Sequence, residues 1–315
     1  MRWQVVTPGV LTTVQDRGRE GWRHLGVARA GALDPQACAL ANELVGNPAG
    51  AAVLELTLHG PTLRLPQTAR IAITGAEVSA TSHGTPLPGH RPLIVPAGEL
   101  KLGAVRAGIR AWLAVGGGFD VPLLMGSRST DLRGGFGGLE GRALHAGDRL
   151  PLGTSAVEEV DDPQIPSWWI GSEYNGSGDA PIRFVAGKHP AAQALQESTW
   201  AVSPDSNRQG IRMRGDPLPG ADNGNVSEPV AIGTLQLPPD GQPIVLLADA
   251  QTVGGYARLG HVIAADLPWL AQAAPGTKLS FLSVNGRQAH EALRRQQQLH
   301  ARTVLALRQR LMAGS

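Results

Sequence analysis

Residues 55–66 read ELTLHGPTLRLP, and residues 228–238 read EPVAIGTLQLP, so one short phrase occurs in each half of the chain. In both copies a glycine, Gly60 or Gly233, follows the glutamate by five positions. A second phrase, R-x-G-x-R, precedes each copy, at residues 19–23 and 208–212. Self-similarity of this kind is typical of an internally repeated fold. The repeat therefore predicts two similar β domains.

Short apolar runs bounded by turn residues recur along the chain and predict strands. The runs are residues 52–58, 69–74, 92–95, 111–115, 182–186, 243–248 and 279–284. The 41 glycines and 24 prolines also favour many short strands over a helical bundle.

Three segments are predicted to be helical. In residues 34–46, Asp34 is the expected N-cap, Pro35 takes the first helical position, and Gly46 lies past the end. Residues 190–199 form a weaker candidate. Residues 287–312 place apolar side chains at helical spacing among Arg and Gln, which predicts an amphipathic helix lying against the body or a partner.

An acidic, Ser/Gly/Asn-rich stretch predicts the linker between the domains. We therefore expect a mainly β chain with an N-terminal domain at residues 1–153 and a linker at 154–180. A C-terminal domain follows at 181–286, and residues 287–315 form the terminal helix.

The composition argues against several classes of partner. The formal charge is +2, charged residues make up 17%, and no run of Lys or Arg reaches four. We expect neither a nucleic-acid nor a membrane partner. The single cysteine, Cys38, excludes an intrachain disulfide and favours a reducing compartment. No signal peptide or apolar run of about 18 residues is present, so a cytoplasmic location is expected.

Common catalytic motifs are absent from the sequence. It contains no P-loop, no G-x-S-x-G, and no second histidine after His290-Glu291 to complete H-E-x-x-H. The nine histidines are scattered, and no metal site is predicted. Cys38 lies between alanines in the first predicted helix, which favours a small buried apolar residue over a nucleophile.

Four regions are unusually dense in polar residues. They are residues 13–19 with 31–34, residues 125–131, residues 206–210 with 227–228, and residues 239–243 with 249–256. Arginine forks, hydroxyls and glycine-exposed amides suit carboxylate, carbamate or phosphate oxygens. The alternative is that these regions are turns and structural Arg–Asp pairs at strand ends.

These same regions carry a family resemblance. TVQDRGR at 13–19, GALD at 31–34, GSRSTDL at 126–132, SNRQGIR at 206–212 and DAQTVGGY at 249–256 occur in one order. The chain resembles the family that joins the C subunit of 5-oxoprolinase, the KipA regulator and the second allophanate-hydrolase-type domain of urea carboxylase. Residues 129–153 are most similar to the free-standing C subunit of bacterial 5-oxoprolinase. One departure is Ala30, where many relatives have Ser or Cys.

The resemblance implies two cyclophilin-like β-barrel domains and an ATP-dependent 5-oxoprolinase that opens 5-oxoproline to glutamate. It implies 5-oxoprolinase subunits A and B as partners, with ATP handled by or shared with them. One alternative is a biotin-dependent carboxyltransferase component acting on urea or a similar amide. Because no biotin-attachment segment is present, biotin would then come on a partner. Another is a KipA-like regulator that binds a kinase-inhibitor protein without catalysis.

Both enzymatic alternatives require activation of a small planar amide, whose carbonyl needs donors aimed at the developing negative charge. The candidate catalytic residues are Arg17, Arg128 and Arg208 as electrophilic clamps, with Asp16 and Glu228 orienting them or carrying protons. The candidate substrate-binding residues are Gln15, Ser127, Ser129, Asn207, Gln251, Thr252 and Tyr256.

Overall fold

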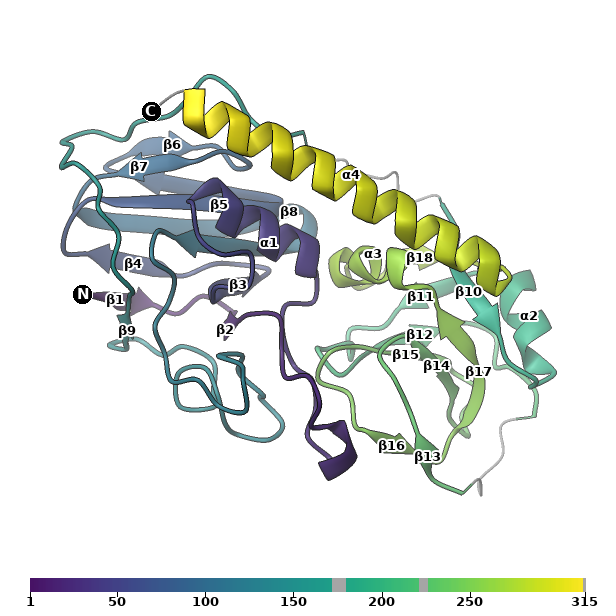
Figure 1. Ribbon diagram of the computed structural model, residues 1–315. Coiled ribbons are helices and arrows are strands. Elements are labelled where there is room, and N and C mark those ends of the chain that lie inside the picture. The colour runs from purple at the N-terminus through teal and green to yellow at the C-terminus, as the bar shows by residue number, and fades with distance from the viewer. Residues whose placement is uncertain (172–179, 221–225, 314–315) are drawn as a thin grey trace. The chain divides into compact units, whose positions relative to one another are not determined.

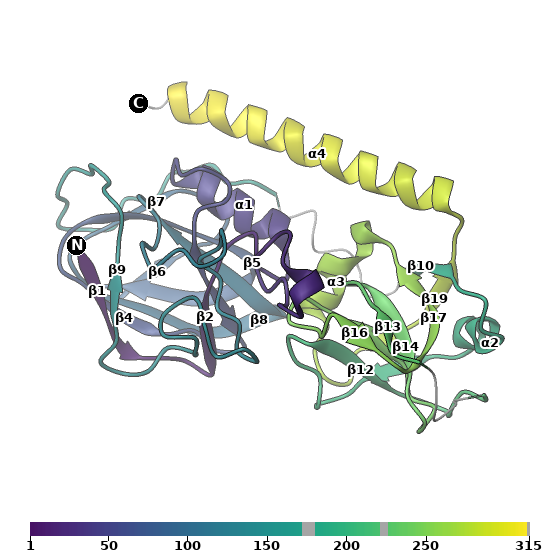
Figure 2. The ribbon, with the colours of Figure 1, turned by 60° about the horizontal axis from the view of Figure 1, so that its bottom comes forward.

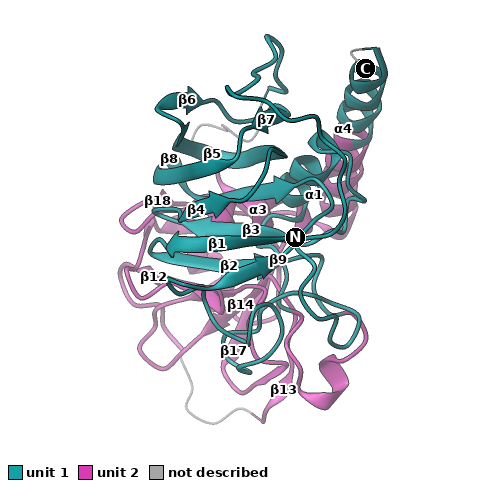
Figure 3. Ribbon diagram, turned by 90° about the vertical axis from the view of Figure 1, so that its left-hand side faces the viewer, with its two compact units in different colours: residues 1–19, 30–174, 301–315 teal, residues 20–29, 175–300 magenta. Residues whose placement is uncertain are grey.

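The structure is a computed structural model that describes residues 1–171, 180–220 and 226–313 (Figure 1). Figure 3 colours its two compact units. The first unit comprises residues 1–19, 30–174 and 301–315, and the second comprises residues 20–29 and 175–300. The predicted N-terminal domain, 1–153, lies in the first unit apart from residues 20–29, and the predicted C-terminal domain, 181–286, lies in the second. Part of the predicted linker, residues 172–179, lies outside the described residues.

The first unit is built on a nine-stranded sheet in the order β2-β3-β8-β4-β1-β9, and β5 joins it by pairing with β8, β6 and β7. Its two longest strands are β5, with 14 residues, and β8, with 18 residues. Strand β8 pairs with β3, β4 and β5 along its length. The elements are β1 Arg2–Thr7, β2 Leu11–Gln15, α1 Pro35–Leu44, β3 Val53–Thr57, β4 Thr62–Leu65, β5 Ala69–Ser82, β6 Thr85–Leu87, β7 Leu93–Val95, β8 Gly98–Val115 and β9 Arg149–Pro151.

Helix α1 covers one face of strands β5 and β8 (Figure 1 and Figure 2). Its start follows the predicted cap: Asp34 Oδ1 accepts the backbone N–H groups of Gln36 and Ala37 at 3.0 Å, and Pro35 is the first helical residue. Gly46, with φ +80°, follows the end. The buried face of α1 includes Leu44, which packs with Trp112 of β8. The local sequence signals for this helix are thus confirmed.

The second unit contains an eight-stranded sheet in the order β18-β11-β12-β15-β14-β17-β10-β19 and a small β13–β16 ribbon. Its two outermost strands are separated in sequence only by Ser280, so the sheet curls into a nearly closed barrel. The elements are η1 Arg23–Leu25, β10 Ile182–Ala186, α2 Ala191–Glu197, β11 Trp200–Val202, β12 Gly210–Arg214, β13 Glu228–Pro229, β14 Thr234–Leu237, β15 Ile244–Leu246, β16 Val253–Gly254, β17 Ala257–Val262, η2 Ala264–Asp266, α3 Leu267–Gln272, β18 Lys278–Leu279 and β19 Phe281–Ser283.

The long terminal helix α4 runs from Gly286 to Ala313. Its residues to 300 belong to the second unit, where Gln296 Nε2 donates to the Ala265 carbonyl at 3.0 Å. Its later residues belong to the first unit, where Leu307 is buried against the α1 cluster and Arg308 forms two hydrogen bonds with Glu43 of α1. The predicted fold class, two mainly β domains of barrel type with few helices and a C-terminal helix, is confirmed.

Candidate functional site

In the first unit, the Asp16 carboxylate at the end of β2 organises the loop that carries the G-S-R-S motif. Its Oδ1 accepts the Ser127 and Ser129 hydroxyls, both at 2.6 Å, and its Oδ2 accepts the Arg128 backbone N–H at 2.6 Å. The Gly18 N–H also donates to Oδ1, at 2.8 Å. Asp16 is buried, and charge-assisted hydrogen bonds of this kind are among the stronger ones in proteins. Asp16 therefore fixes the backbone of residues 127–129.

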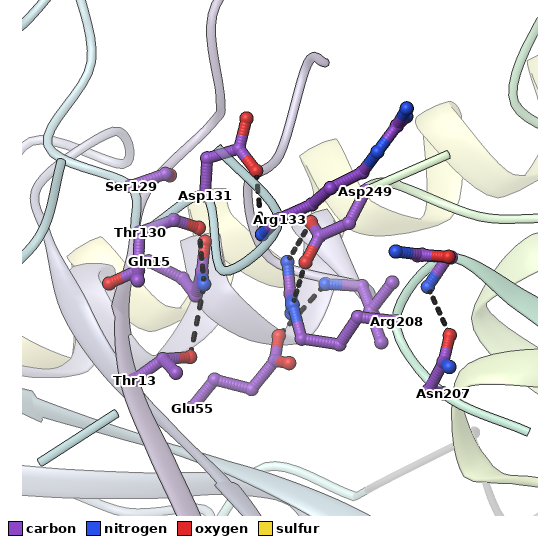
Figure 4. Close-up of polar contacts among 12 residues, drawn as sticks. Thr13, Gln15, Glu55, Ser129, Thr130, Asp131, Arg133, Asn207, Arg208 and Asp249 are labelled. Carbon is purple, nitrogen blue, oxygen red and sulfur yellow. Dashed lines mark hydrogen bonds and ion pairs between the residues drawn. The ribbon is translucent and has the colours of Figure 1, made fainter. Parts of the chain in front are cut away.

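The predicted hydroxyl and amide contacts of this loop are internal. Ser127 and Ser129 have no exposed surface and are occupied by Asp16. Gln15 is equally buried, and its Nε2 donates to Thr13 Oγ1 at 3.0 Å and to the Thr130 carbonyl at 3.2 Å (Figure 4). Among the described residues, Gln15 Oε1 has no hydrogen-bond partner. These side chains therefore join strand β2 to the loop.

The two predicted arginine clamps of this unit differ in how they are held. Arg128 is partly exposed; its Nε donates to the Val121 carbonyl at 2.9 Å and its Nη2 pairs with Asp120 at 2.8 Å. Arg17 is exposed beside Gly50 and has no hydrogen bond or ion pair to any residue in the described ranges. Arg17 thus offers a guanidinium with its donors available to a ligand.

Arg19 is a buried residue of this cluster that prediction from the sequence missed. It is 1% exposed, and its Nη2 donates to the Ser129 carbonyl at 2.5 Å. Its Cζ lies over the Phe136 ring, 4.6 Å from the ring centroid. Its position as the first arginine of the repeated R-x-G-x-R phrase was the available signal. The second copy begins with Arg208, which is also buried.

In the second unit, Arg208 is held by a carboxylate that prediction from the sequence also missed. Its Nε and Nη2 each donate to an oxygen of Asp249 at 2.9 Å, and both side chains are at most 3% exposed (Figure 4). The neighbouring Asn207 Oδ1 accepts the Gln209 N–H at 2.8 Å. The Arg208–Asp249 ion pair ties the turn before β12 to the loop after β15.

The remaining predicted residues of this unit lie on or near the β13–β16 ribbon. Glu228 pairs in register with Gly254, and its carboxylate forms an ion pair with Arg258 of β17. Gln251 Nε2 donates to Gln236 Oε1 at 3.4 Å, whereas Thr252 is largely buried.

A pocket of about 720 Å³ opens between this ribbon, strand β17 and the loop after β10. This volume is in the range of small-molecule sites. The polar side chains that line it are Lys188, His189, Glu228, Tyr256, Arg258 and His261. Glu228 and Tyr256 are predicted site residues, whereas the two basic residues and the histidines are additions from the structure. The pocket can receive a small polar ligand.

His261 is the titratable group in this pocket whose pKa is lowered. Burial lowers it first, and the nearby Arg258 charge lowers it further. Its Nδ1 lies 3.3 Å from Thr234 Oγ1. Besides its two histidines, the pocket has two basic residues, Lys188 and Arg258, and one carboxylate, Glu228.

Three further observations concern metal sites, membrane spans and the cysteine. In the described part of the chain, no group of three or more His, Cys, Asp and Glu side chains converges as a metal site would require. None of the helices described is both long and apolar enough to span a membrane. Burial raises the pKa of the Cys38 thiol, which keeps it protonated and unreactive.

Comparison with known proteins identifies relatives along nearly the whole chain. Residues 25–283 match the family model "Carboxyltransferase domain, subdomain A and B". The C subunit of 5-oxoprolinase from Escherichia coli is 39% identical over 93% of this chain and 95% of its own length. The urea amidolyase of Lachancea kluyveri is 31% identical over 92% of this chain but only 17% of its own length.

A solved structure shows the same fold. The crystal structure of Kluyveromyces lactis urea carboxylase matches with a TM-score of 0.84 and 28% identity. The match covers 97% of this chain and 29% of that protein, so this chain corresponds to a part of the larger enzyme.

Proposed function

Because this chain belongs to the family of carboxyltransferase domains made of subdomains A and B, we propose that it acts on a small amide as one subunit of a 5-oxoprolinase. One observation carries the proposal: the similarity to the C subunit of a 5-oxoprolinase covers 93% of this chain and 95% of that subunit. The urea amidolyase similarity covers only a fraction of a longer protein. The 5-oxoprolinase subunit is thus the relative that this chain matches over nearly its whole length.

In this proposal the chain supplies binding and polarising groups for the lactam of 5-oxoproline. A lactam is planar and stabilised by resonance, so its carbonyl oxygen must be polarised before the ring can open. Two places here have suitable donors: the exposed Arg17 guanidinium in the first unit, which pairs with none of the described residues, and the basic side chains of the pocket in the second. Asp16 and Asp249 would act as positioning residues, since each holds the backbone or side chain of a neighbour.

The energy source belongs to the partners in this proposal. The sequence has no P-loop, and we assign no residue of this chain to ATP. 5-Oxoprolinase subunits A and B would bind and hydrolyse ATP, alone or at a site shared with this chain. The chain would then be inactive alone and active in the complex.

The test is a reconstitution with co-expressed subunits A and B. Glutamate release and ATP hydrolysis would be measured with 5-oxoproline, with urea and without substrate, each with and without this chain. We expect glutamate release only from the three-part mixture with 5-oxoproline. Full-rate release by A and B alone would refute the proposal.

The relationship to urea carboxylase supports a second candidate, a carboxyltransferase component that acts on urea. Because no biotin-attachment segment is present in the sequence, a biotinylated carrier would have to be supplied by a partner. This candidate predicts urea-dependent ATP hydrolysis in the presence of such a carrier. When a biotinylated carrier and its biotin carboxylase are added to the assay, ATP hydrolysis that depends on 5-oxoproline and not on urea decides against this candidate.

A further inference from the structure

Arg258 and His261 of β17 line the second unit's pocket, and each is paired with a buried polar residue of β14 that lies behind the lining. In the β14–β17 ladder, Gln236 lies opposite Arg258, and Thr234 lies opposite His261. Directly opposed residues point to the same face, with their Cβ atoms about 5 Å apart. The other face carries Leu235 and Leu237, which are fully buried. An amide and a guanidinium thus share one small area of the sheet.

Gln236 has an unused donor on this face. It is 1% exposed, and among the described residues its Nε2 makes no hydrogen bond. Gly254, a lining residue of the pocket, lies directly over it, because a Cβ at that position would be 2.5 Å from Nε2. A buried donor without an acceptor is destabilising. An acceptor that entered beside Gly254 would remove this cost.

The cations of the pocket also have capacity for a ligand. Lys188 is exposed and forms no ion pair within the described ranges. Arg258 pairs with Glu228 through Nη2, and the structure shows no other partner for its guanidinium among the residues it describes. A guanidinium has five N–H donors in a fork that matches a carboxylate. Exposed Val226 and Tyr256 add apolar surface at the rim.

We propose that this pocket binds a small molecule in which a carboxylate lies next to a planar amide. Arg258 and Lys188 bind the carboxylate, and Gln236 Nε2 donates to the amide carbonyl oxygen beside Gly254. The inference rests on the proposed function, because 5-oxoproline is a molecule of this class. It also separates this chain from an enzyme for urea, which has no carboxylate to place against Arg258.

The first test is calorimetric titration of the full-length chain with three probes: 5-oxoproline, 2-pyrrolidinone and urea. The second probe keeps the lactam ring without the carboxylate. We expect 5-oxoproline to bind at least tenfold more tightly than 2-pyrrolidinone, and urea to give no measurable binding. Equal affinity for the two lactams, or no binding of 5-oxoproline, would overturn the inference.

Variants locate the binding to the pocket. We expect Lys188→Gln and Gly254→Ala each to weaken 5-oxoproline binding about tenfold, the second because the new methyl group would lie only 2.5 Å from Gln236 Nε2 and would displace that donor. Glu228→Gln releases Arg258 and should tighten binding several-fold. Lys278 is an exposed lysine of β18, and Lys278→Gln is the matched control, which should leave the affinity for 5-oxoproline unchanged. Thermal unfolding of each variant checks that it is folded.

The reconstituted complex separates this inference from the proposed function. If the complex releases glutamate from 5-oxoproline but Lys188→Gln leaves its KM unchanged, the proposed function stands and the pocket assignment fails. If the chain binds 5-oxoproline through these residues but the complex releases no glutamate, the assignment stands and the proposed function fails.

Discussion

Arg208 and Asp249 form a buried ion pair closed by two hydrogen bonds of 2.9 Å, across 41 residues of sequence. Breaking a buried ion pair by removing one of its partners typically costs about 3–5 kcal/mol. We therefore expect Asp249→Ala to lower the free energy of unfolding by about that amount in urea denaturation. Arg214→Ala, which breaks an exposed pair with Asp205, is the control and should cost less than about 1 kcal/mol. If Asp249→Ala costs as little as Arg214→Ala, the buried pair contributes little to stability.

Removing the Asp16 carboxylate should lower the free energy of unfolding more than removing either serine hydroxyl that it binds. Hydrogen bonds to charged groups contribute about 1.5–3 kcal/mol each, and Asp16 accepts several. Asp16→Ala should lower the free energy of unfolding by at least about 3 kcal/mol, and Ser127→Ala by about 1–2 kcal/mol. Asp161→Asn, on the exposed surface, serves as the control. Equal effects of the three substitutions in urea denaturation would contradict the role assigned to Asp16.

Much of the fold could be predicted because its signals are local. Asp34, Pro35 and Gly46 mark the ends of α1 within a few residues of the helix itself. The run at residues 69–74 predicted the start of β5 but not its continuation to Ser82, where exposed and buried residues mix. The second half of β5 is held as a strand by its pairing with β8. A pattern within residues 75–82 alone cannot predict this pairing.

The site was harder to predict because its contacts are distant in sequence. The polar regions were recognised, but not that Asp16 would bind Ser127, 111 residues away. Arg19 and Asp249 were missed since an arginine or aspartate is usually exposed, and their burial depends on Phe136 and Arg208. Lys188 reaches the pocket only because β10 pairs with β17.

The pH dependence of stability should report on Asp34. Burial, with a smaller contribution from the Glu55 charge, raises the pKa of Asp34 from 3.8 to about 6. The folded state therefore binds this proton more tightly than the unfolded state, and the contribution of Asp34 to stability falls as pH rises from about 4 to 6. Above pH 6 the ionised group costs up to about 3 kcal/mol.

Asp34→Asn tests this assignment, because asparagine caps a helix as well as aspartate does and does not ionise. We expect the variant to be more stable than the parent at pH 8 by about 1–3 kcal/mol, and nearly equal to it at pH 4.5. Urea denaturation at the two pH values measures the difference. A variant that is less stable at both would show that the charge of Asp34 favours the cap.

Two leucines on helix α4 form a matched pair for testing how the helix is held. Leu307 is 3% exposed in the cluster with α1, whereas Leu305 is 60% exposed. Leu307→Ala should lower the free energy of unfolding by about 2–4 kcal/mol, since it removes buried methyl groups. Leu305→Ala should change it by less than about 0.5 kcal/mol. Equal effects in urea denaturation would show that the end of α4 does not pack as described.

Arg17 separates a role in activity from a role in stability. Its guanidinium is exposed, and no described residue pairs with it, so Arg17→Gln should change the free energy of unfolding by less than about 0.5 kcal/mol. If Arg17 polarises the substrate carbonyl, the same variant should lower kcat of the reconstituted complex at least tenfold, because such donors typically contribute a factor of about 100 or more. Arg106→Gln, an exposed arginine of β8, is the control and should leave glutamate release unchanged. Equal rates for the two variants would remove Arg17 from the proposed chemistry and leave the basic pocket of the second unit as the remaining candidate.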